Sequence, residues 1–91
     1  MGKKLILTGR VQSVGCRQYC SAYAKDFNIR GSATNRADGS VAVLLNTNDE
    51  GLVHAFKKAL LSNPRGYLFF GEISSIKTDD YSGEFSGDYT F

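Results

Sequence analysis

Residues 8–17 change directly from a strand pattern into a helix pattern, which constrains the fold more than any other stretch. Before this point, Leu5, Leu7, Gly9 and Val11 alternate with other residues at period two, as on one face of a β-strand. Ser13 and Gly15 then break the alternation, and an amphipathic pattern follows. We therefore predict a strand over residues 3–11, a short loop, and a helix from residue 16 or 17 to residue 28.

The junction between this strand and this helix has the chemistry of an anion site. The start of a helix after a glycine-containing loop offers unpaired backbone N–H groups, and the helix dipole favours negative charge there. The planar guanidinium of Arg17 suits two oxygens of a phosphate. We interpret Ser13, Val14, Gly15, Cys16 and Arg17 as a small phosphate-binding loop. The alternative is a surface arginine, but its charge would oppose the helix dipole, which favours a bound anion.

The middle of the chain predicts a hairpin. Residues 29–36 form a weak strand pattern, and residues 40–46 form a stronger one with Val41, Val43 and Leu45 on one side. The residues between them, Ala-Asp-Gly, are typical of a tight turn. If the first of these strands lies beside the strand at residues 3–11, Asn35 comes near the phosphate-binding loop.

A second helix and a further strand pattern follow the hairpin. Thr47 and Glu50 have the spacing of a capping box, and the helix they begin ends near Leu61, before Pro64. Residues 67–77 predict a long strand that is buried on both faces at its start. Residues 78–87 predict a loop and residues 88–91 a short closing strand.

The order of these elements is β-α-β-β-α-β, with a possible fifth strand. This order predicts an α+β fold, a ferredoxin-like sandwich in which two helices pack on one face of a four- to five-stranded antiparallel sheet. At 91 residues the chain has the size of one domain, residues 1–91. The fold alone decides no function, because many functions share it.

Charge and composition favour a small anionic ligand over a large partner. The net charge of +2 is too small to indicate nucleic acid or a membrane surface. The apolar runs are too short for a membrane span or a signal peptide, so we expect a cytoplasmic protein, and nothing requires more than a monomer. His54 lies off the apolar stripe of its helix and is the only histidine, so we predict no metal site.

The two cysteines are four residues apart, one helical turn on the same face. We interpret Cys16 and Cys20 as small buried side chains. The alternative is that Cys16, near a helix start and Arg17, has a lowered pKa and is prone to oxidation.

Two segments resemble the signatures of a known family. Residues 9–17, GRVQSVGCR, resemble the first signature of the acylphosphatases, G-x-V-Q-G-V-G-F-R. Residues 31–41, GSATNRADGSV, resemble the second signature, in which an asparagine precedes a D-G-x-V turn. The spacing of the signatures, the chain length and the order of elements also match. The resemblance therefore covers essentially the whole chain.

The resemblance implies hydrolysis of the carboxyl–phosphate bond of small acyl phosphates, without a metal or cofactor and without nucleic acid or membrane partners. Carried over residue by residue, it implies that Arg17 binds the phosphoryl group and that Asn35 orients the attacking water. Five residues depart from the family pattern. Ser13 replaces a glycine, Cys16 and Ser32 replace aromatic residues, Thr34 replaces a basic or long residue, and Thr47 stands where a glycine is expected. If the backbone at Ser13 needs a positive φ, this residue costs stability or reshapes the loop.

Two other functions are compatible with the sequence. Residues 65–70, RGYLFF, partly resemble the RNP1 motif of RNA-binding domains with the same element order, although they follow the second helix instead of lying between the helices. The chain could also be a non-catalytic, anion-binding regulatory domain that has kept the fold.

Overall fold

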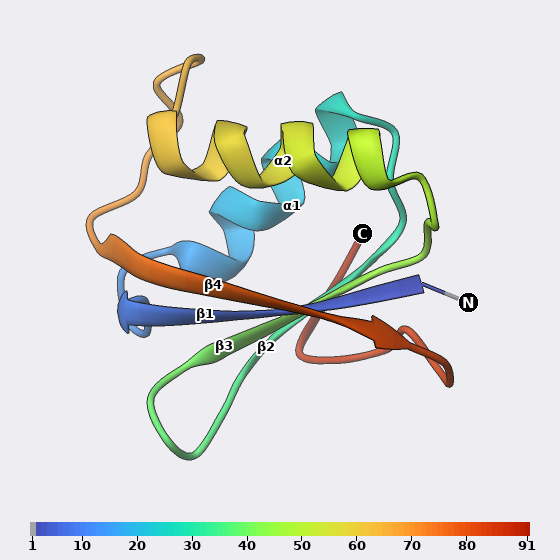
Figure 1. Ribbon diagram of the computed structural model, residues 1–91. Coiled ribbons are helices and arrows are strands. Elements are labelled where there is room, and N and C mark those ends of the chain that lie inside the picture. Colours follow the sequence, from blue (N-terminus) through green and yellow to red (C-terminus); the bar gives the residue numbers. More distant parts are fainter. Residues whose placement is uncertain (1) are drawn as a thin grey trace.

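A computed structural model describes residues 2–91 and shows two helices above one twisted sheet (Figure 1). The elements in chain order are β1 (Gly2–Arg10), α1 (Cys16–Asp26), β2 (Gly31–Asn35), β3 (Val41–Leu45), α2 (Glu50–Ser62), β4 (Glu72–Tyr81) and β5 (Tyr89–Thr90). Both helices cover the same face of the sheet (Figure 1). The predicted ferredoxin-like α+β fold is confirmed, with five strands.

The sheet has the order β4-β1-β3-β2-β5, and all its neighbouring strands are antiparallel. The prediction that β2 could lie beside β1 is wrong, because β3 separates them. β1 pairs with β3 on one side and with β4 on the other, so it is an interior strand. Its C-terminal end leads into the loop before α1, so the predicted phosphate-binding loop lies beyond the end of an interior strand.

The core lies between the sheet and the two helices. It is built from alternate residues of β1 and β3, as the period-two pattern predicts. Tyr19 and Tyr23 of α1 and Phe56 of α2 cover these residues. The largest buried side chains are Tyr19, Tyr23, Phe56, Leu5, Leu7, Leu45, Val11, Val41 and Val43, each no more than 2% exposed.

The aromatic segment after α2 is not a strand, which corrects the prediction for residues 67–71. Tyr67 and Phe69 are half-buried and pack on the tyrosines of α1, with the Phe69 ring stacked on Tyr19 at a centroid distance of 4.5 Å. Leu68 and Phe70 are 76% and 70% exposed, so this start is not buried on both faces. The segment runs along α1 outside the sheet, from Tyr67 beside Asp26 to Phe70 beside Val14. It therefore lacks the sheet-surface position that the RNP1 motif requires.

Residues 78–81 belong to β4, which corrects the prediction of a loop that begins at residue 78. β4 runs through Tyr81 and pairs along β1 as far as Gly2. It is an edge strand with much of its surface in solvent, so its outward positions hold polar residues that obscure the strand pattern.

The helix ends agree only in part with the predicted signals. Asp49, not Thr47, caps α2, because its Oδ1 accepts a hydrogen bond from the Leu52 N–H at 3.0 Å. Thr47 Oγ1 instead accepts a hydrogen bond from the N–H of Asp49 at 3.2 Å. The helix ends before Pro64, as predicted, and its C-cap residue Asn63 has a φ of 47°.

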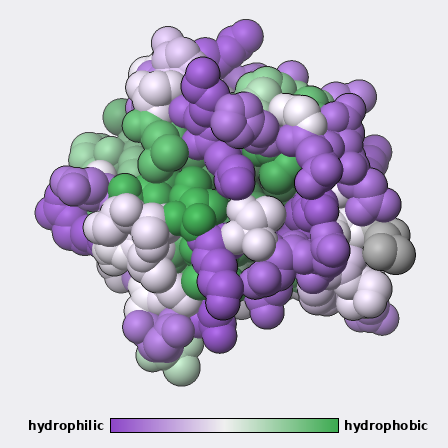
Figure 2. All heavy atoms as spheres, viewed as in Figure 1, coloured by the Kyte–Doolittle hydropathy of each residue, from purple (hydrophilic) through white to green (hydrophobic). Residues whose placement is uncertain are grey.

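Apolar side chains also reach the surface between α2 and β4, where Figure 2 shows them bordered by polar side chains. A groove there is lined by Leu61 and Ile76 together with Lys57 and Lys58. Neither helix in the described part of the chain has the length and apolar character to span a bilayer.

Candidate active site

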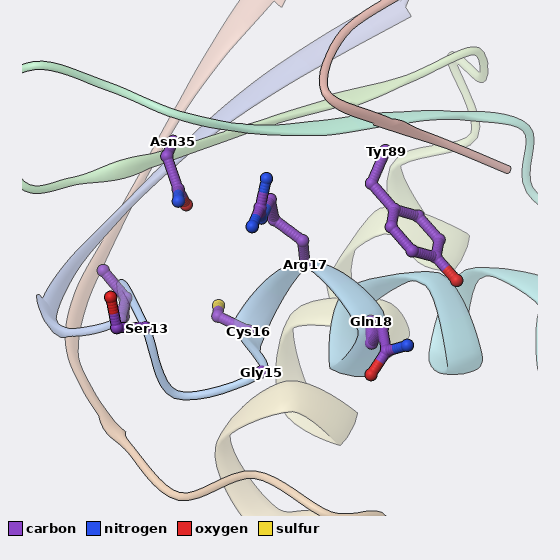
Figure 3. Close-up of a pocket in the computed structure, with 8 residues that line it drawn as sticks. Ser13, Gly15, Cys16, Arg17, Gln18, Asn35 and Tyr89 are labelled. Atoms are coloured by element: carbon purple, nitrogen blue, oxygen red, sulfur yellow. The ribbon is translucent and has the colours of Figure 1, made fainter.

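A pocket of about 250 Å³ lies where β1 ends, α1 begins and β2 ends (Figure 3). Its walls come from the loop before α1, from the first turn of that helix, and from β2 and β5. The lining residues are Val11, Ser13, Gly15, Cys16, Arg17, Gln18, Asn35 and Tyr89. Arg17 is the only charged residue among them, so the pocket suits an anion.

The loop before α1 holds an unusual backbone conformation. Ser13 has a φ of 61° and Gly15 a φ of 80°, both in the left-handed region. Gly15 is the N-cap of α1, and no side chain caps this end of the helix. The first turn also lacks an acidic residue. The helix start therefore keeps backbone N–H donors without a side-chain acceptor, next to the pocket.

Two neighbouring segments hold this loop in place. Gln12 Nε2 donates hydrogen bonds to the carbonyl oxygens of Arg36 at 2.6 Å and Ser40 at 2.9 Å, which ties the loop to the β2–β3 turn. On its other side, the Phe70 N–H donates to the Val14 carbonyl oxygen at 3.1 Å. The loop is thus fixed before any ligand arrives, as a binding site of low entropic cost requires.

Arg17 and Asn35 reach into the same pocket from α1 and β2 (Figure 3). Asp88, just before β5, does not line the pocket but contacts both of these residues. Its Oδ2 lies 3.4 Å from Arg17 Nη1 and accepts a hydrogen bond from the Asn35 backbone N–H at 3.1 Å. The backbone N–H of Asp88 donates to Thr34 Oγ1 at 3.0 Å, so the carboxylate is held beside the end of β2.

Most residues predicted from the sequence come together in this pocket. Ser13, Gly15, Cys16, Arg17 and Asn35 line it. Val14 is not among the lining residues, because its side chain packs against the core. The sequence reasoning missed Gln18 and Tyr89, which also line the pocket, and Asp88, which contacts Arg17. Gln18 could have been found as the residue after Arg17 on the same helix turn, whereas the position of β5 has no local signal.

Cys16 and Cys20 are both buried, as predicted, with their sulfur atoms 4.0 Å apart. The side-chain hydrogen bond with Cys20 lowers the pKa of Cys16, and the positive charge of Arg17 acts in the same direction. The same hydrogen bond, together with burial, raises the pKa of Cys20 well above its usual value. Any ionisation of the pair therefore falls on Cys16, but only 2% of this residue is exposed.

His54 is exposed on α2, as predicted. Within residues 2–91, no cluster of three or more histidine, cysteine, aspartate or glutamate side chains could hold a metal ion.

Comparison with known proteins agrees with both the fold and the signatures. The acylphosphatase family model matches residues 3–89. A curated acylphosphatase of Lactococcus lactis is 40% identical over 78 residues, which cover 82% of this chain and 80% of that protein. One of Polaromonas naphthalenivorans is 48% identical over 68 residues, covering 75% and 67% of the two chains.

A solved structure supports the same fold. The crystal structure of acylphosphatase from Bacillus subtilis superposes with a TM-score of 0.75 over 99% of this chain and 98% of its own, at 24% identity. Because the family model spans nearly the whole chain and the relatives match most of it, this chain belongs to the acylphosphatase family of hydrolases.

Proposed function

We propose that this protein hydrolyses the carboxyl–phosphate bond of small acyl phosphates, releasing a carboxylate and inorganic phosphate. The observation that carries the proposal is the meeting of Arg17 and Asn35 in one pocket beside the uncapped start of α1. The curated relatives named acylphosphatase support the choice of substrate class.

In this proposal the phosphoryl group binds at the start of α1. The Arg17 guanidinium and the backbone N–H groups of residues 13–17 hold its oxygens and stabilise their charge. The Asn35 carboxamide oxygen accepts a hydrogen bond from a water and directs that water at the phosphorus. Positioning and charge stabilisation are most of what phosphoryl transfer requires.

The leaving group explains why a strong general base or acid is not needed. An acyl phosphate is a mixed anhydride, so the bond from phosphorus to the carboxylate oxygen breaks to give a stable carboxylate. Water supplies the new oxygen on phosphorus, and both of its protons stay on the product, which leaves as dihydrogen phosphate. The total charge of −2 is the same before and after the reaction, so no protein side chain has to keep a proton.

We further propose that the chain acts as one domain and as a monomer in the cytoplasm, on small molecules and without nucleic acid or membrane partners. The two free cysteines fit a reducing compartment. Size-exclusion chromatography with light scattering tests the oligomeric state, and a single-chain mass is expected.

The test of the activity is the hydrolysis of benzoyl phosphate by the purified protein without added metal. Arg17→Ala and Asn35→Ala should each lower kcat/KM by about 100-fold or more, as the loss of a key charge-stabilising or positioning group does. Arg30→Ala and Asn48→Ala remove the same side-chain types from exposed positions outside the pocket, and both should keep wild-type activity. Hydrolysis that survives both pocket substitutions would refute the mechanism, and tight RNA binding without hydrolysis would refute the function.

A further inference from the structure

Asp88 brings a negative charge to the one positive charge in the pocket. Its Oδ2 contacts two residues that line the proposed phosphoryl site, through Arg17 Nη1 at 3.4 Å and the Asn35 backbone N–H at 3.1 Å. Arg17 is the only charged residue that lines the pocket, so this carboxylate offsets the only lining cation.

The position of Asp88 is set by the backbone and not by the ion pair alone. Its N–H donates to Thr34 Oγ1, and the adjoining strand β5 pairs with β2. The glycine before it, Gly87, packs so closely on the side chains of Ser32 and Thr34 that an added β-carbon would overlap them. The segment therefore holds its carboxylate at a fixed place beside Arg17, the residue proposed to bind the phosphoryl group.

We propose that Asp88 is an intramolecular competitor that weakens the binding of phosphate dianions at Arg17. The inference rests on the proposed function, because it takes Arg17 and the adjoining loop as the phosphoryl site. A carboxylate and a phosphoryl group are both oxyanions, and both seek the same donors. The competitor reduces the affinity for substrate, and it also prevents the product phosphate from occupying the site at length.

If Asp88 instead oriented Arg17 for phosphate, it would strengthen phosphate binding. The exposure of the Arg17 and Asp88 side chains argues against this role. The Arg17 and Asp88 side chains are 41% and 43% exposed. Ion pairs in such surroundings contribute little to the order of either side chain. The repulsion between Asp88 and a bound dianion is larger, because a phosphate carries about two charges and lies close to the same oxygen.

The experiment is a calorimetric titration with inorganic phosphate of the wild-type protein, Asp88→Asn and Asp79→Asn. Asparagine keeps the size of Asp88 and leaves an acceptor for the Asn35 N–H. Asp79 is an exposed residue of β4 outside the pocket, so its substitution makes the same change in net charge elsewhere. Asp88→Asn should bind phosphate about tenfold more tightly than wild type, and Asp79→Asn should stay within about twofold.

Two further measurements test whether the charge of Asp88 is the cause. Asp88→Ala should also bind phosphate more tightly, which guards against an effect peculiar to asparagine. Raising the salt concentration should reduce the difference in phosphate affinity between wild type and Asp88→Asn, because salt screens charges at exposed sites. Phosphate binding by Asp88→Asn that is no tighter than by Asp79→Asn overturns the inference.

Arg17→Ala distinguishes the failure of this inference from the failure of the proposed function. If Arg17→Ala still binds phosphate and hydrolyses benzoyl phosphate like wild type, the phosphoryl site is elsewhere and the proposed function fails. If Arg17→Ala loses both properties while Asp88→Asn matches Asp79→Asn, only the role of Asp88 is refuted.

Discussion

Replacing Ser13 with glycine should stabilise the protein. Ser13 has a φ of 61°, and a left-handed backbone costs a residue with a β-carbon about 1–2 kcal/mol. Its side chain makes no hydrogen bond within residues 2–91 that the substitution would remove. Glycine avoids the crowding of the β-carbon but gains freedom in the unfolded chain, which costs about 0.5–1 kcal/mol. The net change is a rise of about 0–1.5 kcal/mol in the free energy of unfolding, with a middle value of about 0.75 kcal/mol.

Urea denaturation and thermal melting measure this change. For a chain of this size, a gain of 1 kcal/mol corresponds to an increase of about 4–8 °C in Tm. Ser82→Gly is the matched control, because Ser82 is exposed and is not among the residues with positive φ. That control should lose up to about 1 kcal/mol through the same unfolded-state effect. A Ser13→Gly variant no more stable than Ser82→Gly would refute the reasoning about backbone strain.

Three further predictions follow from hydrogen bonds and burial. Asn63 has a φ of 47°, a conformation that favours glycine. Asn63→Gly should nevertheless lower the free energy of unfolding by about 2–3 kcal/mol in urea denaturation, because it removes the hydrogen bonds of the Asn63 side-chain amide with Tyr23 and Tyr67. Gln12→Ala should lower the free energy of unfolding by about 1–2 kcal/mol and raise the inhibition constant of phosphate, because it frees the loop before α1 from the β2–β3 turn. A variant that changes neither quantity would contradict this. Burial raises the pKa of Tyr19, so the folded state keeps its proton after the unfolded state loses it, and stability should fall as the pH rises above about 10. This loss should be smaller in Tyr19→Phe, as urea midpoints at pH 8 and pH 10.5 would measure.

The parts of the site that the sequence predicts are those encoded by neighbouring residues. The change from strand to helix at Ser13 and Gly15 is visible as a break in one periodicity and the start of another. The turn before β3 is also local. These segments carry Arg17 and Asn35, and the fold brings both into one pocket although β2 does not lie beside β1.

The parts that the sequence does not predict depend on distant contacts. Tyr89 reaches the pocket and Asp88 reaches Arg17 only because β5 pairs with β2, and a two-residue strand has too little periodicity to be found. The aromatic run from Tyr67 has strand-forming residues, but their rings pack on α1, and tertiary packing overrides the local preference. At the start of α2, two residues could each cap the helix, and composition alone does not decide between Thr47 and Asp49.

The ion pair between Arg17 and Asp88 joins residues 71 positions apart, and β1 pairs with β4 over almost its full length. Such distant contacts form slowly because long segments of chain must first be brought together. The β2–β3 hairpin and the helices, by contrast, use nearby residues. During refolding, the contact between Arg17 and Asp88 should therefore be one of the last to form, well after most of the helical circular dichroism has returned.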